Sequence, residues 1–211
     1  MGRIHRAILI LVVSAVAAFS VNSQEVTKDT KDKDPVAVTS QTTNTQAYVF
    51  LTHHERFKRY VSSTIGPFSL ARIAAGAGIN QWRDSPEEWE QGMKGYGKRV
   101  ASGLGQNAIQ QTVTYGLDEA LGLDTGFQRS KREGFVPRLK VALIQNVTSR
   151  TKHGNRVISA PRFAGVYTGA IVARETWYPE RYSYKDGLRS GTKTLLTGFA
   201  INLVREFVFN W

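Results

Sequence analysis

The pair His53-His54, followed by Glu55, is the first place in the chain where metal chemistry could occur, because imidazole and carboxylate groups are common metal ligands. Adjacent residues on a helix point about 100° apart, so a single ion would not be held by both imidazoles. The ligand spacing of zinc proteases is absent from the sequence. Glu55 also stands three residues after Thr52, which is the spacing of a helix capping box. We therefore predict a helix start here, no metal site and no cofactor.

Two further patterns resemble parts of known enzyme sites. Ser149 and Lys152 have the S-x-x-K spacing of penicillin-binding enzymes, but the partner motifs S-D-N and K-T-G are missing from the sequence. The segment from Gly187 to Lys193 resembles a phosphate-binding loop, yet it has three residues between its glycines instead of four, and no strand is expected before it. These departures lead us to predict neither a serine nucleophile nor a phosphate loop, and no catalytic residue.

One acidic cluster could supply the two carboxyl groups that sugar cleavage requires. Its members are Asp84, Glu87, Glu88 and Glu90. The two middle residues follow a serine and a proline, so they occupy the first turn of an expected helix, where the helix dipole favours negative charge. We assign them to helix capping. A hydrolase that acts on envelope material with this cluster and Arg99 remains an alternative hypothesis.

Positive charge is the strongest compositional signal, because 28 Lys and Arg face 17 Asp and Glu, for a net charge of +11. The excess is concentrated in residues 129–162, where it would attract anions. The residues expected to bind an anion or a membrane are Arg129, Lys131, Arg132, Arg138, Lys140, Arg150, Lys152 and Arg156. No nucleic-acid recognition motif accompanies them. We expect an anionic lipid, an envelope polymer or a membrane protein as partner, and no nucleic acid; a basic surface without a specific ligand is the alternative.

The N-terminal residues predict export. A basic start, the apolar run AILILVVSAVAAF and a small-residue exit form a signal peptide over 1–23, with cleavage expected before Gln24. An uncleaved anchor is the alternative. Residues 24–46 are polar and nearly free of large apolar side chains, so we expect a disordered tether. The chain has no cysteine, and residues 47–211 are therefore expected to form a single domain without disulfides.

Helix start and stop signals dominate the rest of the chain, which predicts a mainly α fold: a compact bundle of five or six helices with one short β-hairpin. The hairpin is expected around residues 152–155, between two β-branched segments. The helices are expected over 53–64, 67–82, from 86 to 121 with a break near 92–97, and over 136–147, 160–177 and 187–209.

Small residues recur one helical turn apart in these segments, and such faces let helix backbones approach closely. The expected packing positions are Gly165, Gly169, Ala173, Ala74 and Gly78. Arginines limit the apolar stretches to about ten residues, which is too short to span a membrane. We therefore expect close packing within a globular bundle, with helices lying in a membrane interface as the alternative.

The last segment also allows a different interpretation. From Leu195 large residues occupy the odd positions, and the chain ends on Trp211. Alternation that closes on a terminal aromatic is typical of the last strand of an outer-membrane β-barrel, which is the alternative fold.

The stretch AAGAGINQWRDSPEEWEQGMKGYGKRVAS, with the later FVPRL, WYP and REF, is similar to a group of uncharacterised exported bacterial proteins. The similarity covers about residues 55–207. It implies a bacterial envelope setting, periplasmic or at the outer membrane, but no reaction, cofactor or binding residues. With the basic region, it leads us to expect a non-enzymatic envelope protein that docks on an anionic membrane surface or a membrane partner.

Overall fold

Local signals in the sequence place most of the helix ends. The Thr52 hydroxyl accepts a hydrogen bond from the Glu55 N–H at 3.3 Å, and the Glu55 carboxylate accepts one from the Thr52 N–H at 2.9 Å, so the predicted capping box is formed. Pro67 is the first residue of the next helix, where its missing N–H is not needed. Gly122, at φ 61°, ends the longest helix in the left-handed conformation that glycine adopts without strain.

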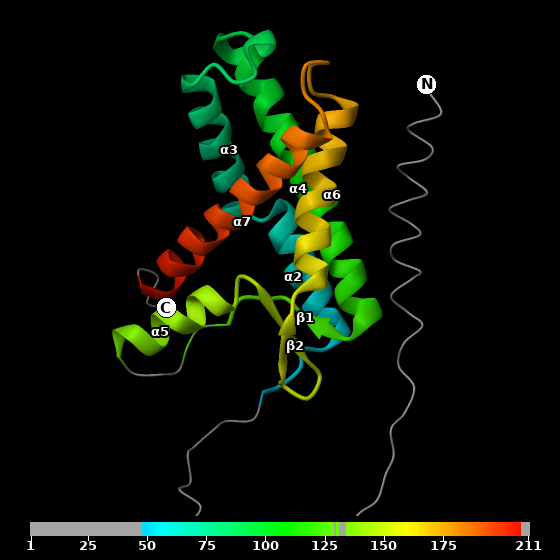
Figure 1. Cartoon of the computed structure of the whole chain (residues 1–211), viewed down its shortest axis with the longest axis vertical. Coiled ribbons are helices and arrows are strands. Elements are labelled where there is room, and N and C mark those ends of the chain that lie inside the picture. Colours follow the sequence, from blue (N-terminus) through cyan, green and yellow to red (C-terminus); the bar gives the residue numbers. More distant parts are fainter. Residues whose placement is uncertain (1–47, 129, 131–133, 208–211) are drawn as a thin grey trace, which may run out of the picture. The chain divides into compact units, whose positions relative to one another are not determined.

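The computed structural model describes residues 48–207 except 129 and 131–133 (Figure 1). The predicted signal peptide and tether lie outside these residues. The elements are α2 (His53–Ile65), α3 (Pro67–Trp82), the 3-10 helix η1 (Glu87–Trp89), α4 (Gly92–Leu121), β1 (Leu123–Asp124), α5 (Phe135–Ile144), β2 (Thr148–Thr151), β3 (Arg156–Ile158), α6 (Ala160–Thr176) and α7 (Tyr184–Phe207). The mainly α fold and the short hairpin are confirmed.

The three strands form a small antiparallel sheet in the order β1-β2-β3. Thr148 pairs with Ile158 in the predicted hairpin, and Leu123 pairs with Thr151. The sequence does not predict β1, because two residues are too few to show alternation. Within the described part of the chain, none of the helices combines the length and the apolar character that a membrane crossing needs.

The prediction of a helix that begins at Ser85-Pro86 and breaks near residues 92–97 is wrong. No side-chain cap forms there, and η1 is followed by Glu90 at φ 60° before α4 starts at Gly92 and continues unbroken. The reason is Arg99, whose guanidinium binds the carbonyls of Ser85, Pro86 and Glu90 at 3.1, 2.8 and 2.7 Å. These bonds hold the segment as a short 3-10 turn, in which the Pro86 carbonyl also accepts from the Trp89 N–H at 3.3 Å.

The alternation that starts at Leu195 does not produce a strand, because these residues belong to α7. Glycines on α7 lie against α6, and their spacing suits a helix. A Cβ added to Gly187 would lie 2.8 Å from the Ile171 Cα, and one added to Gly191 would lie 2.5 Å from the Tyr167 ring. Gly187 and Gly191 are thus packing residues of two antiparallel helices.

The helices α4 and α6 approach even more closely, through the small-residue face that the sequence predicts (Figure 1). A Cβ on Gly165 would lie 2.6 Å from the Gln110 carbonyl oxygen, and one on Gly169 would lie 2.8 Å from the Gln106 carbonyl oxygen. Ala173, one turn further, is fully buried. The same prediction is wrong at Gly78, where an added Cβ would meet no atom within 4 Å.

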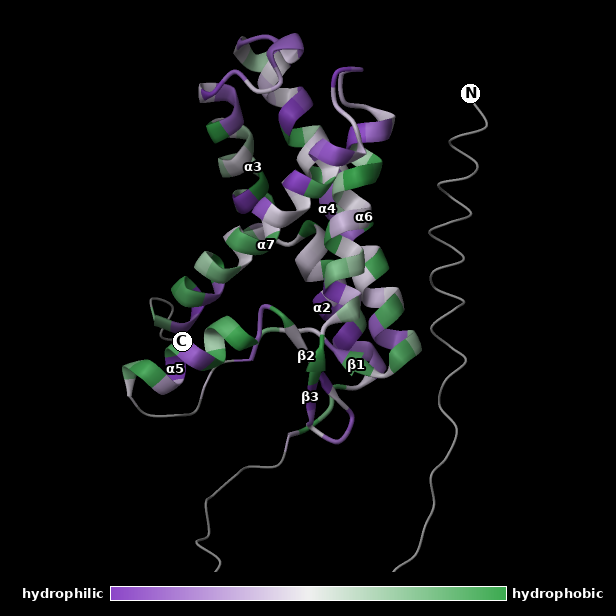
Figure 2. Cartoon of the chain, viewed as in Figure 1, coloured by the Kyte–Doolittle hydropathy of each residue, from purple (hydrophilic) through white to green (hydrophobic). Residues whose placement is uncertain are grey.

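Large apolar side chains fill little of the interior. The buried apolar residues are mostly small: Ile73, Ala77, Trp89, Leu123, Ala142, Val166, Ala170 and Ala173. Polar and charged residues are equally buried, among them Asn107, Asn146, Asn202 and Glu206. Figure 2 shows hydrophilic and hydrophobic bands that alternate along α4 and α7. Close backbone contact and buried hydrogen bonds must therefore supply much of the cohesion that a larger apolar core would give.

The glycine contact can be tested with one substitution at two positions. We expect Gly165→Ala to lower the free energy of unfolding by about 1–3 kcal/mol, because the new Cβ would overlap the Gln110 carbonyl oxygen. Gly116→Ala, in the last two turns of α4 with no atom within 4 Å of the added Cβ, should instead raise it by about 1 kcal/mol through helix propensity. Urea unfolding measures both. A Gly165→Ala protein as stable as Gly116→Ala would contradict the close α4–α6 contact.

Candidate functional site

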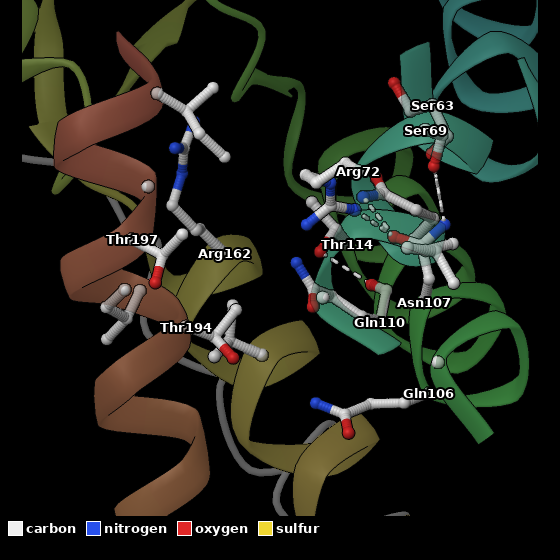
Figure 3. Close-up of a pocket in the computed structure, with 18 of the residues that line it drawn as sticks. Ser63, Ser69, Arg72, Gln106, Asn107, Gln110, Thr114, Arg162, Thr194 and Thr197 are labelled. Atoms are coloured by element: carbon white, nitrogen blue, oxygen red, sulfur yellow. Dashed lines mark hydrogen bonds between the residues drawn. The ribbon is translucent and has the colours of Figure 1, made fainter. Parts of the chain in front are cut away.

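A cavity of about 1050 Å³ is lined by residues of α2, α3, α4, α6 and α7 (Figure 3). One wall of the cavity is formed by the α4 residues that the α6 glycines contact, namely Gln106, Gln110 and Thr114. Thr194 and Thr197 of α7 form the opposite wall. The exposure of Thr197 shows that the cavity is open to solvent.

Three arginines from three helices line this cavity: Arg72 of α3, Arg162 of α6 and Arg205 of α7. Figure 3 shows Arg72 and Arg162 on opposite sides of the space. Burial lowers the pKa of all three guanidinium groups, and brings that of Arg162 to about 10. The positive charge of Arg205 adds to the lowering of the pKa at both Arg72 and Arg162, so Arg205 repels each of the other two.

Neutral groups hold these arginines in place. Arg72 donates to the Asn107 side-chain oxygen at 2.9 Å, and Asn107 is fixed by hydrogen bonds to the backbone of α2 and to Ser69. Arg162 donates to the Asn146 side-chain oxygen at 3.2 Å and to the Thr125 carbonyl oxygen. Arg205 lies over the rings of Phe68 and Phe127, at 4.8 and 5.9 Å from their centroids.

Negative charge in the cavity is scarce. Eight basic side chains line it, against only Asp118 and Asp124 among the described residues. Asp124 is already bound to Arg59 at 2.5 Å. Arg72, Arg162 and Arg205 form no ion pair with any carboxylate that the structure describes. The cavity is therefore strongly positive.

Hydrogen-bond donors also remain free on this wall. In the described part of the chain, buried nitrogen atoms without a hydrogen-bond partner are Nε of Arg162, Nε of Arg174 and Nδ2 of Asn202, and all three residues line the cavity. All three atoms are donors in this setting. Buried donors are normally satisfied, so the cavity is suited to a ligand rich in hydrogen-bond acceptors.

Asp118 is the one carboxylate that acts on the arginine cluster. Burial raises its pKa to about 6, and hydrogen bonds from the Thr125 N–H and hydroxyl, at 3.2 and 2.5 Å, oppose that rise. The nearby charge of Asp124 raises the pKa further, and that of Arg56 lowers it. The Asp118 charge in turn stabilises the Arg162 guanidinium. Protonation of Asp118 near pH 6 would thus make the cavity more positive.

The basic residues that the sequence predicts as an anion or membrane site do not gather in this cavity. Arg129, Lys131 and Arg132 lie outside the described residues. Arg138 donates to the fully buried Glu206 carboxylate at 2.8 Å, and Arg150 lies over the Tyr48 ring at 5.0 Å. Arg156 lies in β3, within 3.4 Å of the Thr148 hydroxyl, while Lys140 and Lys152 are exposed on α5 and the hairpin turn.

The residues of the other motifs have partners as well. His53 contacts Glu119 at 2.8 Å on the surface. Asp84 lies 3.4 Å from Arg99, while Glu87 and Glu88 both contact Arg181, at 3.6 and 2.8 Å. The described residues contain no group of three or more His, Cys, Asp or Glu that could hold a metal ion.

Sequence reasoning uses Arg72 as an interruption of an apolar segment and includes Arg162 in the basic region 129–162, but it does not predict either as a binding residue, and it misses Arg205 and Gln110. The signal that could have identified them is an arginine within a helix face of small residues, as in the segment around Arg72. Comparison with models of known protein families, with curated proteins and with solved structures gives no match. The function must therefore be argued from the cavity itself.

The raised pKa of Asp118 predicts a dependence of stability on pH. Between about pH 4, where an unfolded aspartate titrates, and about pH 6 the folded state binds a proton on Asp118 that the unfolded state does not. Stability from this group is therefore present at low pH and falls as the pH rises through this window. The Asp118→Asn protein lacks this titration, so its stability should not fall in this window. The difference between its free energy of unfolding and that of the wild type should therefore increase by about 1–3 kcal/mol from pH 4 to pH 7. Glu180→Gln, at an exposed carboxylate, should give no such trend in urea unfolding.

Proposed function

We propose that this protein is a non-enzymatic binding protein of the bacterial envelope, and that its ligand carries phosphate or carboxylate groups and binds in the arginine-lined cavity. One observation supports this above all others: Arg72, Arg162 and Arg205, from three helices, share the cavity without a carboxylate partner among the described residues. The signal-peptide pattern in the sequence supports the export part of the proposal.

The energetics of the cluster explain why it points to a ligand. Burying a charge without a partner is costly, and bringing like charges together adds to the cost. Replacing buried ions with apolar residues of similar volume is often neutral or stabilising, so stability alone does not explain charges at these three positions. Groups kept in an unfavourable environment are characteristic of functional sites. A bound anion would offset the repulsion, and guanidinium groups match phosphate and carboxylate oxygens in geometry.

Binding is favoured over the hydrolase alternative by the state of the carboxylates that the alternative requires. Asp84 contacts Arg99, and Glu87 and Glu88 contact Arg181, so each already has a cationic partner. The walls of the cavity carry arginines, amides and hydroxyls, which hold anions and polar ligands.

Anion binding can be measured by thermal unfolding. Pyrophosphate or citrate should raise the Tm by several degrees over KCl at equal ionic strength, since a ligand at 100 times its Kd stabilises by about 2.7 kcal/mol. Arg205→Gln should reduce that rise, because Arg205 lines the cavity and its contacts among the described residues are with the rings of Phe68 and Phe127. The Tm of the Arg205→Gln protein in KCl should not fall, because the substitution removes a charge that repels Arg72 and Arg162. Arg189→Gln, an exposed change on the same helix, should keep the full response. Equal responses from all three proteins would contradict the proposal.

Docking on an anionic membrane surface is the second candidate, and α5 favours it. Phe135, Val136 and Ile144 are exposed along this helix, next to the exposed Lys140. Apolar side chains beside a cation are the pattern of helices that lie in a membrane interface.

Liposome co-sedimentation tests this candidate. The double substitution of Val136→Gln and Lys140→Gln should weaken binding to anionic liposomes, because it removes one exposed apolar side chain and one cation from α5. Leu196→Gln with Lys185→Gln makes the same chemical change at exposed positions of α7 and should have little effect. Binding that is equal for wild type and both double variants would exclude α5 as the docking element.

A further inference from the structure

The cavity is larger than a simple anion requires. Its volume of about 1050 Å³ lies at the upper end of the roughly 300–1000 Å³ typical of pockets for small organic ligands. An inorganic phosphate would contact the arginine cluster and leave most of this space to water. The chemistry of the remaining wall therefore indicates what the rest of the ligand contains.

That wall carries amides and hydroxyls among apolar side chains such as Ile73, Val166 and Ile201. Figure 3 shows Gln106 and Gln110 of α4, Thr194 and Thr197 of α7, and Ser63 of α2 around the same space as Arg72 and Arg162. The Gln110 side chain points into this space. These residues come from helices on both sides of the cavity, so a ligand held by the arginines would contact them from more than one direction.

Several of these groups have hydrogen-bonding capacity to spare. The side-chain amide of Gln110 and the hydroxyl of Ser63 bind no other group that the structure describes, and the Gln106 amide nitrogen is equally free. Thr194 and Thr197 donate to carbonyls of their own helix, at 3.0 and 2.9 Å, so their oxygens remain available as acceptors. The cavity thus presents donors and acceptors side by side.

A sugar suits such a wall, because each of its hydroxyl groups both donates and accepts. An alkyl chain would leave the amides and hydroxyls unpaired, which is costly in a partly buried site. An aromatic base would require a free ring on which to stack, and the described rings of the cavity already contact other groups. Phe68 and Phe127 lie against the Arg205 guanidinium, Tyr178 against that of Arg174, and Tyr60 against Tyr115. The arginines require an acidic group on the ligand.

We infer that the cavity binds an acidic sugar, with a phosphate or carboxylate group at the arginine cluster and sugar hydroxyls at Gln106, Gln110 and the threonines of α7. This inference rests on the proposed function, because it names the class of ligand for the same cavity. A phosphorylated sugar and a sugar acid share this chemistry.

Isothermal titration of the purified protein with five compounds tests the inference: glucose 6-phosphate, glucuronate, glucose, inorganic phosphate and hexyl phosphate. We expect glucose 6-phosphate, glucuronate or both to bind at least tenfold more tightly than inorganic phosphate and hexyl phosphate, and glucose to bind more weakly than either acid. Gln110→Leu should remove the tenfold preference for the sugar while the affinity for inorganic phosphate stays unchanged, which also shows that the variant is folded. Arg72→Gln should weaken the binding of every acidic compound in the set.

The outcomes separate the two proposals. If inorganic phosphate, hexyl phosphate and both acidic sugars bind with equal affinity, the sugar assignment is overturned and the anion-binding function stands. If no acid binds, the proposed function fails, and the sugar assignment fails with it. A Gln110→Leu protein that keeps the full preference for the acidic sugar would show that the amide wall does not contact the sugar.

Discussion

The close approach of α4 and α6 is the contact on which the rest of the structure depends. Gly165 and Gly169 bring the α6 backbone so near to the carbonyls of Gln106 and Gln110 that no side chain fits between them. Because those two glutamines are anchored at the backbone, their amides are held beside α6, where they line the cavity. Helix α7 packs closely against α6 in the same way, through Gly187 and Gly191. Close helix contacts at glycines thus determine the positions of α4, α6 and α7 and of one wall of the cavity.

The polar interior is the second constraint. A domain with no cysteine and few large buried apolar residues must satisfy its buried amides and charges internally. Asn107 does this for the junction of α2 and α3, and Asn146 links the end of α5 to α7 through the Leu195 carbonyl. The same two asparagines hold Arg72 and Arg162. The network that stabilises the fold therefore also orients two charges of the cavity.

Charge is divided between two tasks in this protein. Arg138 with Glu206, Arg59 with Asp124 and Arg56 with Glu119 are ion pairs that join distant segments. Their positive charge is neutralised, and they contribute to the fold. The charge of Arg72, Arg162 and Arg205 is not neutralised by any carboxylate that the structure describes, which leaves these arginines available to a ligand.

The sequence by itself determined the structural features that depend on residues close together along the chain. The capping box at Thr52 and Glu55, Pro67 at a helix start and the hairpin turn at Gly154 were all predictable, because each signal acts within a few positions. The small-residue face from Gly165 to Ala173 was also predictable, since its spacing matches a helical turn. Only the tertiary structure decided which of these faces are buried, and Gly78 shows that spacing alone is not enough. The cavity lay beyond sequence reasoning for the same reason: its arginines stand at 72, 162 and 205, and no local pattern connects residues that only the packing of α3, α6 and α7 brings together.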